Sequence, residues 1–310
     1  MRRPPELSQL GKFPVTGGSI LLAVVVTLAY WNHSDVAFLM EDGNVRRGEV
    51  WRLVTSALPH GDIFHLMFNA YWIWAFGTLV EEVFGHVKTA ALFVLLALGS
   101  GAAEYALLTG GIGLSGVGYG LFGMLWVLSR RDPHFAGSVD SNTTALFVVW
   151  FFACVVLTVT RIFPVGNVAH GAGALIGALV GLAIVGRGVR RISATFATAV
   201  IVAGGLVGAT VARPWVNLSK HGATGELRLG YDALMAGRNE EAAQWLADAT
   251  RMEPRNASGW YDYGIAMSRI GRADAAAAAY AKAYELEPGR EDYKQAYTRQ
   301  KEYLQTLRGK

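Results

Sequence analysis

The sequence is poor in charge, since only 17% of its 310 residues are Asp, Glu, Lys or Arg, whereas 52% are hydrophobic. This composition excludes an ordinary soluble domain of this length, and the 37 glycines suit closely packed membrane helices. The single cysteine, Cys154, excludes an intrachain disulfide. The formal net charge is only +4 and the basic residues are dispersed or flank apolar segments, so nucleic acid is not an expected partner.

Seven stretches approach the ~20 residues that a membrane-spanning helix needs. We expect helices over residues 13–31, 62–84, 87–109, 113–129, 143–160, 167–186 and 192–211. The first resembles the apolar part of a signal peptide. Its end, Tyr30–Trp31–Asn32, is too bulky for a cleavage site, so we expect it to be retained. The fourth is short, which predicts that its start lies below the membrane surface.

The Lys and Arg residues indicate the orientation of these segments. With the N-terminus inside, nine of them lie in or beside the inner loops and four in the outer loops. Positive charge favours the cytoplasmic side, so residues 1–12 are expected to be a cytoplasmic tail of a multi-pass protein in a bacterial plasma membrane. The second, fourth and sixth segments then all begin at the outer face.

Four polar residues lie near the beginnings of those three segments: His65 and Asn69 on the second, Ser115 on the fourth and His170 on the sixth. Strongly polar side chains are costly inside hydrocarbon, and for this reason they usually mark function. A hydroxyl, two imidazoles and a carboxamide at one depth are the groups that hydrolysis by a serine nucleophile requires.

Glycines surround two of these residues. Gly113 and Gly116 flank Ser115, which leaves its hydroxyl uncovered at a helix start with unpaired backbone N–H groups. His170 begins a segment in which glycine recurs every four residues, a smooth strip on which another helix can lie close. The strip consists of Gly173, Gly177 and Gly181. We therefore expect the serine and histidine helices to be packed together.

His65 and Asn69 are four residues apart and share one helix face, so both can donate to one developing oxyanion. A purely structural alternative remains, because buried polar residues also hold membrane helices together by ~1 kcal/mol. Zinc is not expected. The spacing of His60 and His65 does not give H-E-x-x-H, and no thiolate is near. No metal or cofactor is predicted.

These motifs together resemble the rhomboid family of intramembrane serine proteases over residues 45–186. The resemblance rests on H-x-x-x-x-H-x-x-x-N from His60 to Asn69, on G-x-S-G followed by Tyr119, and on a histidine that opens a glycine-repeat helix. Trp51–Arg52 in the first outer loop and Glu81 before Gly85 also match family motifs.

The resemblance implies a role for each residue. Ser115 would be the nucleophile and His170 the general base, while His65, Asn69 and the Ser115 backbone N–H would form the oxyanion hole. Tyr119 would stack on His170, and His60 would be structural. No acidic third member is evident, because nothing in the sequence places Asp62 or Glu104 beside His170. The implied substrates are transmembrane proteins within the lipid bilayer.

Other interpretations stay open at this point. A catalytically inactive rhomboid-like protein would bind membrane clients without cleaving them. A potassium channel is suggested by Val117–Gly118–Tyr119–Gly120, but a selectivity filter is an extended loop, and here an apolar segment continues directly from Gly116. In a third interpretation the membrane region only anchors the C-terminal part of the chain.

That C-terminal part is polar and repetitive. Glycine at 230 and 237, alanine at 242 and 249 and proline at 254 recur 34 residues later, at 264, 271, 276, 283 and 288. This period resembles tetratricopeptide repeats. The expected fold is all-α, with a six-helix rhomboid core plus a seventh helix over 13–211, a linker over 212–222, two soluble repeats over 223–290 and a capping helix over 291–310. If all seven segments span, the repeats are extracytoplasmic, where they would bind a peptide or adaptor protein.

Overall fold

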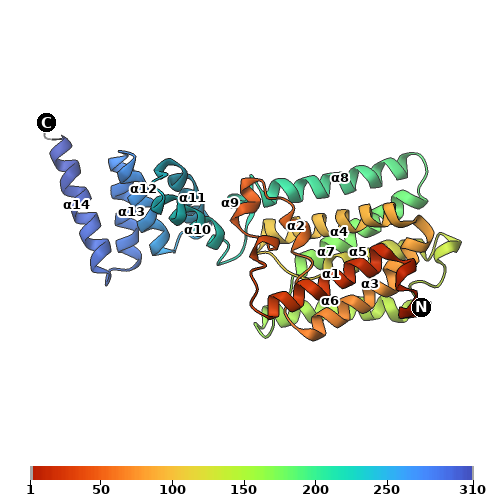
Figure 1. Ribbon diagram of the computed structural model, residues 1–310. Helices are drawn as coiled ribbons and strands as arrows, with labels where there is room; N and C mark the ends of the chain where they lie inside the picture. The colour runs from red at the N-terminus through yellow and green to blue at the C-terminus, as the bar shows by residue number, and fades with distance from the viewer. Residues whose placement is uncertain (1–2, 309–310) are drawn as a thin grey trace. The chain divides into compact units, whose positions relative to one another are not determined.

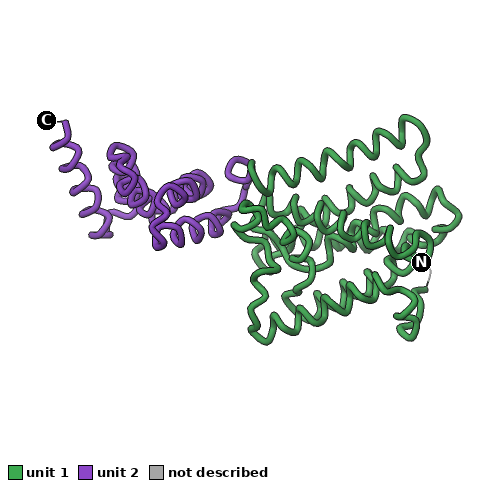
Figure 2. Tube along the Cα trace, turned by 45° about the horizontal axis from the view of Figure 1, so that its top comes forward, with its two compact units in different colours: residues 1–211 green, residues 212–310 purple. Residues whose placement is uncertain are grey.

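The computed structural model describes residues 3–308, and within this range it contains helices and no strand. The chain divides into two compact units, Met1–Val211 and Ala212–Lys310 (Figure 2). Residues 1–2 of the expected N-terminal tail and residues 309–310 of the expected capping helix lie outside the described residues.

The first unit is a bundle of apolar helices (Figure 1). Among residues 3–308, six helices are long and apolar enough to cross a membrane. They are α1 (Pro14–Trp31), α3 (Ile63–Phe84), α4 (His86–Leu107), α6 (Ser141–Val159), α7 (Asn167–Val185) and α8 (Val189–Ala209). The all-α membrane bundle expected from the sequence is therefore confirmed at this level.

The remaining apolar helix, α5 (Ser115–Leu128), is shorter than the 17-residue segment expected from the sequence, because it has only 14 residues and begins at Ser115 itself. At 1.5 Å per residue it is about 21 Å long, which is shorter than a hydrocarbon core of ~30 Å. All of its residues except Ser115 and Trp126 are buried. It is the central helix of the unit, in contact with α3, α4 and α7.

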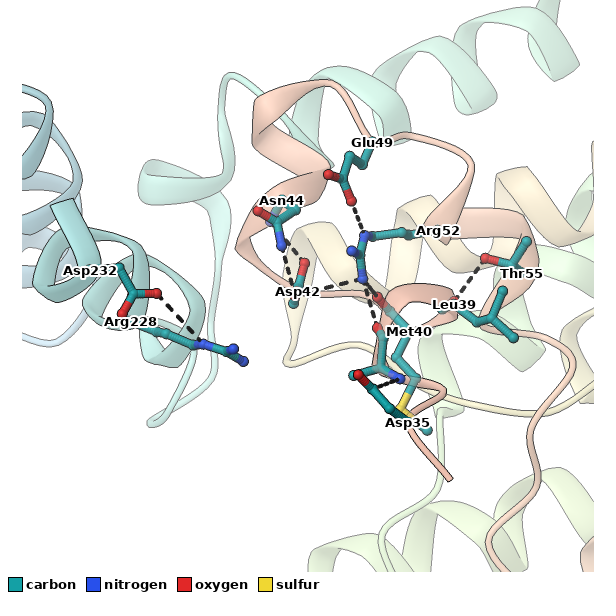
Figure 3. A network of polar contacts seen from close by, with 11 residues as sticks. Asp35, Leu39, Met40, Asp42, Asn44, Glu49, Arg52, Thr55, Arg228 and Asp232 are labelled. Atoms are coloured by element: carbon teal, nitrogen blue, oxygen red, sulfur yellow. Dashed lines mark hydrogen bonds and ion pairs between the residues drawn. The ribbon is translucent and has the colours of Figure 1, made fainter. Parts of the chain in front are cut away.

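The connection from α1 to α3, residues 32–62, is a folded loop with the short helices η2 (Ala37–Leu39), η3 (Gly43–Arg47) and α2 (Arg52–Thr55). Arg52 lies in its interior, with 6% of its surface exposed. Its guanidinium donates to Glu49 Oε2 at 2.6 Å and to the carbonyl oxygens of Ala37 and Met40, as Figure 3 shows for Glu49 and Met40. One arginine thereby joins three parts of the loop.

Glu81 has a similar joining role near the opposite end of α3. Its carboxylate is 2% exposed and accepts hydrogen bonds from the backbone amides of Val15 and Thr16, at 2.9 and 2.8 Å, and from Thr16 Oγ1. These amides belong to the first turn of α1, whose own N-cap residue, Phe13, offers no side-chain acceptor. A carboxylate from one membrane helix thus caps the start of another, which satisfies donors that lipid cannot.

The second unit contains a short helix followed by helical hairpins. Its elements are α9 (Arg213–Val216), α10 (Thr224–Met235), α11 (Asn239–Met252), α12 (Ala257–Arg269), α13 (Ala273–Leu286) and α14 (Glu291–Arg308). The pairs α10–α11 and α12–α13 repeat with the 34-residue period of the sequence. In each pair a glycine faces a large side chain, Gly230 against Leu246 and Gly264 against Tyr280. Gly264 follows Gly230 by 34 residues, and Tyr280 follows Leu246 by the same number.

The segment 212–222, expected to be a linker, is part of this second unit. It contains α9, and Arg213 is only 2% exposed. The Arg213 guanidinium donates to the carbonyl oxygen of Gly222 at 2.9 Å and pairs with Glu226 on α10 at 3.5 Å. A buried arginine needs such partners, and satisfying them folds this segment against α10.

Asp262, on α12, is a half-buried carboxyl group. Its burial raises the pKa of Asp262 to about 6, from an ordinary value of 3.8. The folded state therefore holds this proton more tightly than the unfolded chain does. The stability contributed by the protonated group is fully present below pH 3.8 and is lost as the pH rises through 6.

We expect Asp262→Asn to remove this loss, because the amide stays neutral at every pH. The thermal midpoint of the second unit should exceed that of the wild type well above pH 6, and the difference should shrink as the pH falls toward 3.8. Thermal melts followed by circular dichroism would measure it, with the exposed Asp232→Asn as the matched control. A constant difference at all pH values would contradict the assignment.

Candidate active site

The loop before Ser115 is held by the connection between α1 and α3 through three backbone amides. The Gly111 amide donates to Glu41 Oε2 at 2.9 Å, and the Gly113 amide donates to the carbonyl oxygen of Ser56 at 3.1 Å. The Leu114 amide donates to His60 Nε2 at 3.2 Å. These contacts fix the chain up to the residue that precedes α5. Ser115 then begins the helix, where backbone N–H groups point outward without helical partners.

His60 is fully buried and fixed in one tautomer. Its Nδ1 lies 2.9 Å from the carbonyl oxygen of Leu58, which can only accept, so Nδ1 carries the proton. Its Nε2 accepts from Leu114, and its own carbonyl accepts from Trp31 Nε1 at 2.9 Å. Both ring nitrogens are therefore occupied by the scaffold. The geometry makes His60 a support of the loop before Ser115 and leaves it no free lone pair for a metal.

His65 lies on the face of α3 directed at this loop, and Asn69 lies one helical turn further along the same face. Asp62 caps α3 by accepting from the His65 amide at 3.0 Å, which fixes the turn that carries the imidazole. A Cβ at Gly113 would lie 2.7 Å from His65 Nε2, and the φ of Gly113 is +104°, so this position requires glycine twice over. Asn69 is 4% exposed, and among residues 3–308 its Nδ2 has no hydrogen-bond partner.

His170 stacks on Tyr119. The two rings are 4.5 Å apart between centroids and 19° from parallel. Tyr119 is itself anchored, because its hydroxyl donates to the carbonyl oxygen of Phe147 on α6 at 3.1 Å. Tyr119 follows Ser115 by four residues on α5, so both lie on one face, one turn apart. The imidazole is 3% exposed, and within the described chain its Nδ1 has no partner.

The glycine strip on α7 allows this helix, which carries His170, to lie close to α5, which carries Ser115. A Cβ added at Gly173 would collide with the carbonyl oxygen of Gly116, and one added at Gly177 would collide with that of Gly120. Each contact advances by four residues on both helices, so α5 and α7 run parallel in fixed register. Gly116 is also closed on its other side by Ser100 of α4. Only backbones without Cβ atoms approach this closely.

The site therefore combines several polar groups with unused hydrogen-bonding capacity. Ser115 is half-buried, and in the described part of the chain its hydroxyl makes no hydrogen bond, including to His170. Long or absent contacts between nucleophile and base are common without substrate. Buried polar atoms are otherwise almost always paired, so the unpaired Asn69 Nδ2 and His170 Nδ1 make this a candidate ligand site.

The structure brings most of the residues singled out in the sequence to this site and leaves three elsewhere. Trp51 is 53% exposed on the loop between α1 and α3, Arg52 lies inside that loop, and Glu81 caps α1 at the far end of α3. Among residues 3–308, no group of three His, Cys, Asp or Glu side chains is arranged to hold a metal ion.

Glu41, Ser56 and Glu104 make contacts near the site that the sequence did not predict. Glu104 accepts from the Ala169 amide at 2.8 Å and so lies at the start of the histidine helix, although it does not bind the imidazole. An ionisable residue inside a membrane segment was a usable signal for it. No sequence signal identifies Glu41 or Ser56, because loop geometry alone brings them to residues 111–113.

Comparison with known proteins agrees with this geometry. Residues 47–187 match the model of the Rhomboid domain. The chain is 33% identical over 171 residues to "Rhomboid protease GlpG" of Pectobacterium atrosepticum, an alignment that covers 53% of this chain and 61% of that protein. It is 30% identical over 180 residues to the protein of the same name from Photorhabdus laumondii, covering 54% and 61%.

A shorter relative of the same name, from Haemophilus influenzae, is 27% identical over 180 residues, which cover 56% of this chain and 92% of that protein. The chain spans less than two thirds of the length of the first two relatives. The matched domain lies within the first compact unit, where all the site residues are found. These findings support the rhomboid family for the membrane unit.

Proposed function

We propose that the chain is an intramembrane serine endopeptidase that cleaves transmembrane proteins near the outer face of the membrane. The observation that carries this proposal is the stacking of His170 on Tyr119, one helical turn from the half-buried hydroxyl of Ser115. The similarity to rhomboid proteases supports the same assignment.

In the proposed reaction Ser115 Oγ attacks the scissile carbonyl carbon while the His170 imidazole takes the hydroxyl proton. The negative charge that develops on the carbonyl oxygen is stabilised by Asn69 Nδ2, the His65 ring and the Ser115 backbone N–H. The unpartnered state of Asn69 Nδ2 in the described chain supports this role, since a donor already engaged would have to break a bond first. His170 then returns the proton to the leaving amine.

Water completes the cycle by attacking the acyl-enzyme, with His170 again accepting a proton. The short α5 supports water access, because a helix of 14 residues is shorter than the hydrocarbon core and Ser115 is its first residue, at the end nearer the outer face in the proposed orientation. No acidic residue contacts the imidazole in the described structure, so its orientation comes from the Tyr119 ring. The proposed catalytic unit is a Ser115–His170 dyad.

Ser115→Ala and His170→Ala should each abolish cleavage of a model transmembrane substrate by the purified protein in detergent. Asn69→Ala should retain activity but lose about 10²–10³ in kcat, as expected for one oxyanion donor. Ser129→Ala, at the other end of α5, is the matched serine control and should cleave normally.

A fluorophosphonate probe should label Ser115 in the same preparation. Equal cleavage by wild type and Ser115→Ala would exclude the proposed reaction. Client binding without cleavage, together with an unlabelled Ser115, would favour the alternative of an inactive rhomboid-like binder.

We further propose that the second unit is a pair of tetratricopeptide repeats that recruits substrates or adaptor proteins. The repeated glycine contacts of α10–α11 and α12–α13 support this proposal, as does the 34-residue period. The distribution of Lys and Arg supports a cytoplasmic N-terminus in a bacterial plasma membrane. From a cytoplasmic N-terminus, the six long helices and the short α5 make seven crossings, which supports repeats on the outer side.

A protease added to intact spheroplasts should therefore cleave the chain after Pro214, where Leu218, Lys220 and His221 are exposed, and release the repeats. Lysed spheroplasts provide the control for protease access. Complete protection in intact spheroplasts, with cleavage after lysis, would place the repeats in the cytoplasm.

A further inference from the structure

Glu104 is a buried carboxylate at the outer end of α4, with 3% of its surface exposed. Its Oε2 accepts a hydrogen bond from the Ala169 amide at 2.8 Å, and its carboxylate also accepts from the Val168 amide. A Cβ at Gly166 would lie 3.5 Å from the same carboxyl group. Glu104 therefore lies directly at the start of α7, the helix that carries His170.

The start of α7 needs an acceptor from elsewhere. Its N-cap residue is Gly166, which has no side chain with which to cap the helix. The first amides of a helix lack helical partners and carry the positive end of the helix dipole, so a carboxylate is a strong partner for them. Hydrogen bonds to a charged acceptor are roughly twice as strong as neutral ones. Glu104 on α4 supplies this acceptor across the helix boundary.

The bond acts where α7 meets α5. Ala169 immediately precedes His170, and its Cβ is 3.7 Å from the position a Cβ would take at Gly116, the residue after Ser115. The carboxylate thus holds the turn that carries the imidazole against the turn that carries the hydroxyl. A hydrogen bond from Asn167 Nδ2 to Thr158 Oγ1 also holds the start of α7, against α6. It joins two uncharged side chains and does not involve Ala169.

We propose that Glu104 is a positioning residue of the Ser115–His170 pair, an assignment that rests on the proposed function. Its carboxylate fixes the height and rotation of the first turn of α7, and through it the imidazole relative to Ser115 Oγ. It touches neither the imidazole nor the hydroxyl. It acts on the backbone before the histidine.

Glu81 provides a matched control, because it is equally buried and caps the start of α1 through the Val15 and Thr16 amides. The test compares Glu104→Ala and Glu104→Gln with Glu81→Ala and Glu81→Gln. For each folded variant it measures the thermal midpoint, kcat and KM on a model transmembrane substrate, and the rate at which a fluorophosphonate labels Ser115.

Glu104→Ala should lower kcat and the labelling rate by about 10²-fold, the effect typical of a displacement of ~1 Å in a catalytic group, with KM unchanged. Glu104→Gln should recover part of both rates, because its amide oxygen can still accept from Ala169. Glu81→Ala should lower the thermal midpoint while the folded fraction keeps the wild-type kcat and labelling rate.

If Glu104→Ala loses thermal stability but keeps the wild-type kcat and labelling rate, Glu104 is only a structural cap and the assignment is wrong. If Glu104→Ala does not fold, the same result in Glu104→Gln leads to the same conclusion. The proposed function would survive that result, because wild-type cleavage would still depend on Ser115. An absence of Ser115-dependent cleavage in the wild type would instead overturn the proposed function and this assignment with it.

Discussion

The close contact between α5 and α7 determines the rest of the membrane unit. Gly173 and Gly177 lie so near the carbonyl oxygens of Gly116 and Gly120 that any Cβ would collide with them. Such backbone contact stabilises membrane helices where no hydrophobic effect between helices exists. It also holds the start of α5, with the Ser115 hydroxyl, level with the first turn of α7, which carries the His170 imidazole. The packing that holds the fold together therefore also assembles the site.

Carboxylates at helix starts provide the second recurring device, and two of them, Glu81 and Glu104, are buried. Asp62, Glu81 and Glu104 each accept from backbone amides at the start of a helix, namely α3, α1 and α7. In water these amides would be solvated, whereas in a bilayer each needs an acceptor from the protein. Two of the three carboxylates come from a different helix, so they also tie helices together. Charge in this bundle holds helix ends in place, and apolar contact fills the space between them.

The sequence indicates the polar groups of the candidate site but not the supports around them. His65, Asn69, Ser115 and His170 are recognisable because polar residues are rare in apolar segments, and the glycine strip on α7 shows which helices come close. The contacts of Glu41 and Ser56 with residues 111–113 depend on how a loop folds, which has no periodic pattern. The exact start of α5 and the folding of residues 212–222 onto α10 likewise follow from tertiary partners.

The most direct measurement of the central claim is the rate at which a fluorophosphonate labels Ser115 in Gly177→Val and in Gly204→Val. A side chain at Gly177 collides with the carbonyl oxygen of Gly120, whereas Gly204 on α8 has no atom within 4 Å of such a Cβ. If the close approach of α5 and α7 assembles the site, labelling is lost in folded Gly177→Val and retained in Gly204→Val. Equal labelling of the two folded variants would contradict the account.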